Sequence, residues 1–227
     1  MLRHLSHPVT PLAQNATLIW CDVTGAAAWV DPGADAAALE RIARDQGVHL
    51  EKILLTHGHL DHVGAASELA KRTGAPIIGP HRDDAFWLEQ LPAQAQIFGF
   101  SEVQPLVPDQ WLDDGDTIEL GQATLHVLHC PGHTPGHVVF HDPEGRLALV
   151  GDVLFHGAIG RSDFPRGNGR ELLDSITGKL WPLGDDTRFV PGHGPESTFG
   201  EERRSNPFVG DDVIVAAGGE PGRGRYY

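Results

Sequence analysis

The sequence predicts an α/β fold in which two sheets pack face to face and helices cover their outer sides. Three observations support this. Short apolar runs are separated throughout by glycine and proline, which number 28 and 17. Strand-like runs come first in succession and then alternate with helical patterns, and this order occurs twice along the chain. Because no linker is long enough to divide the chain, we expect one domain over residues 1–209 and a mobile tail over 210–227.

Composition excludes several classes of protein. Hydrophobic residues make up 40% of the 227 residues, as in ordinary globular proteins. The formal net charge of -14 is opposite in sign to that of a nucleic-acid binder. No apolar run approaches membrane-spanning length, and Met1–Thr10 lacks a secretory signal pattern. With two cysteines and no disulfide framework, we expect a cytoplasmic protein. The charge and the lack of a long apolar run lead us to expect that it binds neither nucleic acid nor a membrane. The sequence leaves its oligomeric state open.

The first half of the chain alternates strand and helix patterns. The expected elements are strands at Ala16–Trp20 and Ala26–Val30, a turn at Asp31–Gly33, a helix over Asp35–Gln46, a strand at Ile53–Leu55, a helix over His62–Thr73 and a strand at Ala75–Gly79. Leu39, Ile42 and Ala43 share one face of the first helix at helical spacing. Gly47 and Gly74 can end the two helices.

The second half is richer in strands. Residues 81–110 mix aromatics with prolines and predict a helix followed by a long connection. The other expected elements are strands at 117–120, 123–129, 137–141 and 146–150, a helix over Glu171–Leu180, a strand at Arg188–Val190 and a short helix over Glu201–Asn206. Because His126 alternates with Leu125 and Val127, we expect it on the opposite face, away from the core.

One segment concentrates residues that can bind a metal. Thr56-His57-Gly58-His59-Leu60-Asp61-His62 follows an apolar strand and precedes a helix, so its side chains lie on a loop where they can converge. Imidazole and carboxylate together suit zinc, manganese or iron, and the lack of cysteine argues against a purely structural zinc site. The alternative is a cluster of capping or surface histidines.

Three further segments repeat one pattern, in which a strand end is followed by glycine and a donor residue. They are Pro131-Gly132-His133, Gly151-Asp152 and Pro191-Gly192-His193. A glycine before each donor permits the backbone to approach a crowded centre closely. The repetition favours a metal centre over a surface cluster.

The order of these motifs resembles the metallo-β-lactamase superfamily, from Asn15 to about Phe208. The resemblance implies an αββα sandwich with the metal site at one edge of the two sheets. It implies two divalent metal ions, with zinc expected and iron or manganese as alternatives. One ion would be held by His57, His59 and His133, the other by Asp61, His62 and His193, with Asp152 bridging the two.

Such a ligand set indicates hydrolysis without a serine or cysteine nucleophile. Two divalent cations roughly 3.5–4 Å apart can share a water and lower its pKa, and the resulting hydroxide attacks a carbonyl carbon. Asp61 and Asp152 are the expected catalytic residues, since Asp61 can orient the hydroxide and Asp152 bridges the metals.

Finer features resemble the short bacterial relatives of hydroxyacylglutathione hydrolase (glyoxalase II), which cleave thioesters such as S-lactoylglutathione. These features are FHGAIGRSDFPRG over 155–167, PGHGP over 191–195 and GEERRSNP over 200–207. The resemblance implies that Arg161 binds the glutathione carboxylate, and the alternative is a salt bridge from Arg161 to Asp163. Asp163 and Gly194–Glu196 stand where full-length glyoxalases have tyrosines.

Other functions stay open at this point. A glutathione persulfide dioxygenase would use a single iron at the first site, and a lactonase or β-lactamase would share the two-metal chemistry. A non-catalytic binding domain could also keep the fold. Among nearby residues, Asp31 is either a plain turn residue or a partner of a metal histidine. We expect structural roles for Cys130 and His137.

Overall fold

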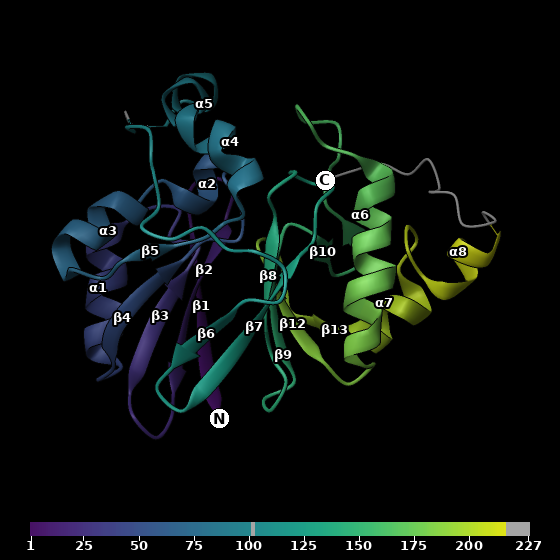
Figure 1. Ribbon diagram of the computed structural model, residues 1–227, viewed down its shortest axis with the longest axis horizontal. Helices are drawn as coiled ribbons and strands as arrows, with labels where there is room; N and C mark the ends of the chain where they lie inside the picture. The colour runs from purple at the N-terminus through teal and green to yellow at the C-terminus, as the bar shows by residue number, and fades with distance from the viewer. Residues whose placement is uncertain (101–102, 217–227) are drawn as a thin grey trace.

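The protein is described by a computed structural model over residues 1–100 and 103–216. Two sheets pack face to face, with helices on both outer sides (Figure 1). This arrangement confirms the predicted αββα sandwich. In the same described residues, no helix combines the length and the apolar character needed to cross a membrane.

The first half of the chain builds one sheet and its helices. Its elements are β1 (Leu2–Val9), β2 (Gln14–Cys21), β3 (Ala26–Val30), α1 (Ala36–Asp45), β4 (His49–Leu54), α2 (Leu60–Val63), α3 (Ala66–Thr73), β5 (Ile77–Ile78), the 3-10 turn η1 (Arg82–Asp84), α4 (Ala85–Glu89) and α5 (Leu91–Phe98). The strands lie in the order β1-β2-β3-β4-β5. The first two pairs are antiparallel and the last two are parallel.

The second half builds the other sheet. Its elements are β6 (Thr117–Leu120), β7 (Ala123–His129), β8 (Val138–Asp142), β9 (Leu147–Gly151), β10 (Leu154–Phe155), β11 (Ala158–Ile159), α6 (Gly169–Ser175), the π-helical turn η2 (Ile176–Leu180), the 3-10 turn η3 (Trp181–Leu183), β12 (Arg188–Pro191), β13 (Ser197–Thr198), α7 (Phe199–Ser205) and α8 (Asp211–Ala216). The large sheet has the order β13-β12-β9-β8-β7-β6, and β10 and β11 form a separate pair.

Strand β3 shows why the sheets form a sandwich. All five of its residues are buried, as expected for a strand covered on both faces. Ala26, Ala28 and Val30 belong to the core between the two sheets. Ala27 and Trp29 belong to the core under α1 and α3. The α6 and α7 helices cover the opposite outer face (Figure 1).

Several expectations need correction. The single helix predicted over His62–Thr73 is wrong, because α2 ends at Val63 and α3 begins at Ala66. At the break, the Ala65 backbone N–H donates to the Pro32 carbonyl at 2.9 Å instead of continuing one helix. The turn after β3 therefore interrupts a helix whose apolar spacing alone predicts no interruption.

The remaining differences lie at element ends and edges. Strand β1, not predicted, is an edge strand that pairs with β2 over eight residues and carries mostly polar or half-buried side chains. The predicted strand Ala75–Gly79 shortens to two residues. The helix predicted over Glu171–Leu180 begins at Gly169, where the Asn168 side chain caps it, and changes to the π-helical turn after Ser175. In the predicted tail, 211–216 form α8, and 217–227 lie outside the described residues.

Candidate metal centre

The seven predicted donor residues come together at one edge of the sandwich. His57 and His59 lie in the loop after β4, and Asp61 and His62 lie in α2. His133 lies between β7 and β8, Asp152 follows β9, and His193 follows β12. Strands of both sheets thus deliver donors to one place, although the donors are up to 136 residues apart in sequence (193 minus 57).

His57, His59 and His133 form what we call the first donor group. The Nδ1 atom of His59 lies 3.1 Å from the Nε2 atom of His57 and 3.1 Å from the Nε2 atom of His133. A tetrahedral zinc ion with bonds of about 2.0–2.1 Å places its nitrogen ligands roughly 3.3 Å apart. The spacing of these three nitrogens therefore suits one metal ion.

Asp61, His62 and His193 form the second donor group. The Nε2 atom of His193 lies 3.2 Å from Asp61 Oδ2, and that of His62 lies 3.8 Å from the same oxygen. Asp152 lies between the two groups. Its Oδ1 is 3.3 Å from His62 Nε2, and its Oδ2 is 3.7 Å from the Nε2 atoms of both His133 and His193.

Asp31 orients His62 and His57 through the ring nitrogen that faces away from the other donors, directly for His62 and through Thr56 for His57. Its Oδ2 accepts from His62 Nδ1 at 2.9 Å and from the Thr56 hydroxyl at 2.5 Å. Because the Thr56 hydroxyl donates to Asp31, its oxygen can accept from His57 Nδ1, which lies 3.0 Å away. Both contacts place a proton on Nδ1 and leave Nε2 as the nitrogen that can bind a metal. Of the two roles left open for Asp31, the geometry favours the partner of a histidine.

Backbone carbonyls orient two more of the histidines. The Nδ1 atom of His133 lies 2.7 Å from the carbonyl oxygen of Arg161. The Nδ1 atom of His193 lies 3.2 Å from the carbonyl oxygen of Leu12, in the turn between β1 and β2. A carbonyl only accepts hydrogen bonds, so each contact places a proton on Nδ1 and leaves Nε2 as the nitrogen that can bind a metal.

The two donor groups differ in their protonation. Burial, together with the neighbouring histidines, lowers the pKa of His57 well below its usual value and that of His59 to about 3. Burial also lowers the pKa of His62 and His193, but the carboxylates of Asp61 and Asp152 outweigh it and raise both pKa values. The first group is therefore neutral, and the second is an ion-paired cluster.

The donor set fits a metal cation. Among the described residues, the buried atoms His62 Nε2 and Asp152 Oδ1 lie 3.3 Å apart, and neither forms a well-aligned hydrogen bond. Leaving buried polar atoms unpaired is costly, so native structures normally give them a partner. A cation between His62 and Asp152 satisfies both atoms, and imidazole with carboxylate is a ligand combination typical of zinc and iron.

The glycines that precede His193 and His133 have different roles. Gly192 lets the backbone lie close to the metal donors, whereas Gly132 does not. A Cβ atom at Gly192 would overlap Asp152 and His62, so this position needs glycine beside the centre. At Gly132 a Cβ atom would instead overlap Leu172 of α6. The glycine before His133 therefore allows a helix to pack, whereas the sequence pattern suggested close approach to the centre.

Asp84 supports the first donor group and was not identified from the sequence. Its side chain is fully buried and accepts hydrogen bonds from the backbone N–H of Gly58, the Thr134 hydroxyl and the backbone N–H of Gly136. Burial raises the pKa of Asp84 to about 6. One carboxylate thus ties the loop of His57 and His59 to the loop of His133. Its signal in the sequence is weak, because an aspartate before a helix is ordinarily a cap.

Aromatic side chains cover the first donor group. The ring of Trp87, on α4, meets the ring of His59 edge-on at 4.6 Å. The ring of Phe164 contacts His59 at 4.8 Å and His133 at 5.7 Å. The Gln94 side chain, on α5, links the start of α2 to α4, because it accepts a hydrogen bond from the Leu60 backbone N–H and donates one to the Trp87 carbonyl. These contacts limit the access of water to the first group.

The remaining predicted residues fall into supporting positions. The Arg161 side chain forms a two-pronged ion pair with Asp163, with both nitrogen–oxygen distances 2.9 Å. Cys130 is fully buried, and burial raises its pKa to about 12, which removes it as a nucleophile. His137 stacks on His57 at 4.7 Å and accepts from the Asp152 backbone N–H at 3.0 Å. His126 is exposed on β7, as expected.

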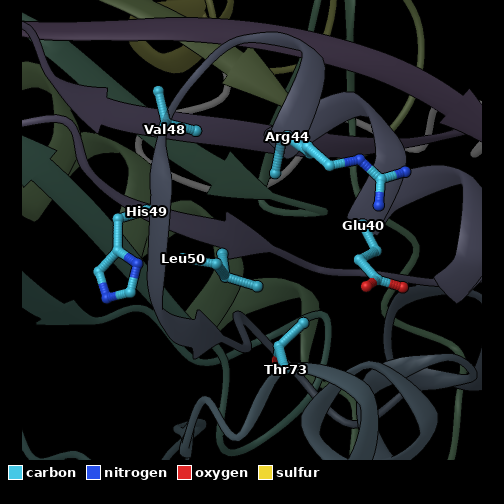
Figure 2. Close-up of a pocket in the computed structure, with 7 residues that line it drawn as sticks. Glu40, Arg44, Val48, His49, Leu50 and Thr73 are labelled. Carbon is cyan, nitrogen blue, oxygen red and sulfur yellow. The ribbon is translucent and has the colours of Figure 1, made fainter.

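Two other features lie apart from these donors. His81, Asp83 and His129 bring three possible ligand atoms within 4.8 Å of one another. However, His129 Nε2 is already 2.8 Å from the Pro135 carbonyl. A surface hollow of about 280 Å³ is lined by residues that include Glu40, Arg44 and Thr73 (Figure 2), and none of the seven donors lines it.

Comparison with known proteins gives consistent matches over most of the chain. The family model of the metallo-beta-lactamase superfamily matches residues 9–193, a range that contains all seven donors. The chain is 47% identical over 203 residues to the hydroxyacylglutathione hydrolase GloC of Haemophilus influenzae, covering 89% of this chain and 95% of that protein.

Two solved structures resemble the fold closely. The B3 metallo-beta-lactamase BLEG-1 superposes with a TM-score of 0.84 at 34% identity, covering 91% of this chain and 99% of that chain. The di-iron-bound form of TTHA1623 superposes with a TM-score of 0.82 at 36% identity, covering 89% and 98%.

Proposed function

The chain belongs to the metallo-beta-lactamase superfamily and is a metal-dependent hydrolase, and on that premise we propose that it hydrolyses a thioester such as S-lactoylglutathione. The observation that supports this substrate class is the similarity of the chain, over nearly the full length of both proteins, to a relative named hydroxyacylglutathione hydrolase. The small molecule proposed as substrate is thus a glutathione thioester or a close analogue.

We further propose that the centre holds two divalent metal ions. His57, His59 and His133 would hold one, Asp61, His62 and His193 the other, and Asp152 would bridge them. Zinc suits the imidazole and carboxylate donors, and the di-iron form of TTHA1623 makes iron the alternative. When bound, such ions supply Lewis acidity and make a water acidic enough to serve as nucleophile near neutral pH.

The chain's own residues supply position and exclusion of water. Asp61 Oδ2 lies 3.2 Å from His193 Nε2, in a partly exposed side chain, and can accept a hydrogen from an attacking water, which would hold the water oxygen towards a carbonyl carbon. Trp87 and Phe164 contact the His59 ring and keep bulk water from the first group. Cys130, buried with a raised pKa, takes no part, so no acyl-enzyme intermediate forms on it.

A substrate panel tests this function. The purified protein is assayed with S-lactoylglutathione, a lactone and a β-lactam, as isolated, after a chelator, and after reloading with zinc or iron. We expect thiol release from the thioester, loss of release with the chelator, and recovery with metal. His126→Ala, which changes an exposed histidine away from the donors, serves as the control and should match the unmodified protein.

The other outcomes of the panel discriminate among functions. Cleavage of the β-lactam without cleavage of the thioester would support the function named for BLEG-1 instead. Oxygen uptake with glutathione persulfide, without thioester cleavage, would support a persulfide dioxygenase. Either result contradicts the thioester proposal.

A further inference from the structure

Two arginines lie on the loop that covers the metal centre, and their partners differ. The Arg161 guanidinium is paired with the Asp163 carboxylate through two hydrogen bonds and lies 4.5 Å from the Phe164 ring centroid. The Arg166 guanidinium lies over the Phe86 ring at 4.2 Å. Within residues 1–100 and 103–216, no carboxylate forms an ion pair with Arg166. The charge of Arg161 is neutralised, and that of Arg166 is not.

Arg166 is connected to the centre by a continuous aromatic path. Phe86 and Trp87 are neighbours on α4, with ring centroids 5.0 Å apart. The Trp87 ring in turn contacts the His59 ring at 4.6 Å. The Arg166 guanidinium therefore belongs to the same set of stacked rings that covers the first donor group.

The backbone holds Arg166 in this place. Its φ of 63° lies in the left-handed region, which non-glycine residues rarely adopt. The following residues are anchored, since the Gly167 N–H donates to the Phe164 carbonyl and the Asn168 N–H donates to the Gly132 carbonyl, each at 2.8 Å. Gly132 precedes His133, so the position of Arg166 is fixed relative to the first donor group.

The negative charge of the protein gives the unpaired Arg166 guanidinium a possible role in binding an anionic substrate. The chain has a formal net charge of -14, and the side chains of Asp61, Asp152 and Asp163, in or beside the centre, are all partly exposed. An anionic substrate meets repulsion from these carboxylates unless a cation receives it. An arginine stacked on an aromatic ring keeps its in-plane N–H groups free, and these match a carboxylate in geometry.

We propose that Arg166, stacked on Phe86, is the binding site for a carboxylate of the substrate, and that Arg161 is not. This inference rests on the proposed thioester hydrolysis. Arg161 is instead a positioning residue: its carbonyl orients His133, and its side chain is paired with Asp163 and lies over Phe164. The ligand class is therefore a thioester whose thiol part carries a carboxylate.

Kinetics with two substrates tests the assignment. The first is S-lactoylglutathione, and the second is the same thioester with both carboxylates converted to carboxamides. In Arg166→Ala we expect KM to rise about tenfold for the first substrate, with kcat nearly unchanged, because a partly exposed charge-assisted pair is lost. For the carboxamide substrate, KM should not change.

Matched variants and a binding measurement complete the test. Arg166→Lys keeps the charge without the planar fork and should restore KM in part. Arg170→Ala removes a nearby exposed arginine that pairs with Asp174, and should leave both substrates unaffected. Calorimetric titration with S-hexylglutathione, a thioether that cannot be hydrolysed, should show the same tenfold loss in Arg166→Ala. This loss should shrink at high salt, because salt screens the interaction.

Each other outcome overturns a defined claim. If Arg166→Ala affects both substrates equally or neither, or if only Arg161→Ala raises KM for the carboxylate substrate, Arg166 is not the carboxylate site. If the unmodified protein cleaves neither thioester, the proposed function fails, and the carboxylate site fails with it.

Discussion

The first donor group is closed to solvent, whereas the second is partly open. His57, His59 and His133 are 0%, 8% and 3% exposed, and aromatic rings cover them. In the second group, the side chains of Asp61 and His193 are 15% and 27% exposed. A closed group of neutral histidines favours tight metal binding, while an open group with carboxylates leaves room for exchange and for substrate. We expect the two groups to bind metal with different affinities.

The two groups also depend on different supports. Asp84 ties together the two loops that carry the first group. The second group relies on Asp31 behind His62 and on the Leu12 carbonyl behind His193. Because Asp31 reaches the first group only through Thr56, single substitutions should disturb one group more than the other. Asp152 contacts donors of both groups directly.

The largest effect is expected for Asp152→Ala, which removes the carboxylate shared by the groups. Both groups should lose metal affinity, and turnover should fall by about a thousandfold or more, since metal stabilisation of the reaction is worth several kcal/mol. Elemental analysis of the dialysed protein and steady-state kinetics measure the two effects. Activity close to that of the unmodified protein would exclude a bridging role for Asp152.

A second prediction concerns Asp84→Asn, which preserves shape but replaces one acceptor oxygen with an amide donor. It leaves a buried N–H or hydroxyl without its acceptor, which costs about 1–3 kcal/mol. Metal affinity of the first group should fall roughly 10–100-fold, as for other residues that support ligands, and the second group should change little. Competition with a chromophoric chelator measures both affinities.

Asp83→Asn is the matched control, because the Asp83 side chain is 61% exposed and adjacent in sequence. It should leave both affinities unchanged. Thermal unfolding of the two variants separates a local loss of metal from general destabilisation. If Asp84→Asn weakens both groups equally at unchanged melting temperature, the separate supports proposed above are wrong.

Sequence analysis anticipated the donors but not the supports. The seven donors follow strand ends in dense or repeated motifs, so local sequence revealed them, and the structure brings all seven together. Asp84 and Gln94 act through long-range contacts across 26 to 52 residues, which no local pattern encodes. The break between α2 and α3 was missed for the same reason, because it depends on the Pro32 carbonyl.

Secondary structure was predictable where the spacing of apolar residues is regular, and less predictable in strands at the edge of a sheet. Strands β6 and β7 match their predicted ranges, since alternation along them is clear. Edge strand β1 was not predicted, because its four central residues are all half-buried and include polar side chains. Its sequence therefore lacks a clear alternation of apolar and polar residues. For Arg161, sequence offered two roles, and the ion pair with Asp163 became visible only in the structure.

A third, smaller effect separates the two roles of Asp31. Asp31→Asn alters the acceptor for His62 directly and for His57 only through Thr56. We expect about a tenfold loss of metal affinity in the second group and a smaller loss in the first. Thr56→Val removes only the hydroxyl relay and should weaken the first group alone. Chelator competition on both variants measures this, and the opposite ranking would show that the relay, not the direct contact, dominates.

The pH dependence of metal binding bears most directly on the contrast between the groups. Histidine must lose its proton to bind metal. The carboxylates raise the pKa of His62 and His193 against the effect of burial, so protons compete with metal at the second group as the pH falls through neutrality. Burial lowers the pKa of His57, His59 and His133, so these residues are already deprotonated and their affinity should stay constant.

Between pH 8 and pH 6, the affinity of the second group should therefore fall by up to about tenfold per pH unit for each competing proton, while that of the first group holds. Metal titration followed by calorimetry at several pH values measures both. Asp61→Asn removes one carboxylate that raises the pKa of His193, so the pH dependence of the second group should become shallower. Equal pH dependence at both groups would mean that the carboxylates do not set the difference between them, and that exposure alone distinguishes the open group from the closed one.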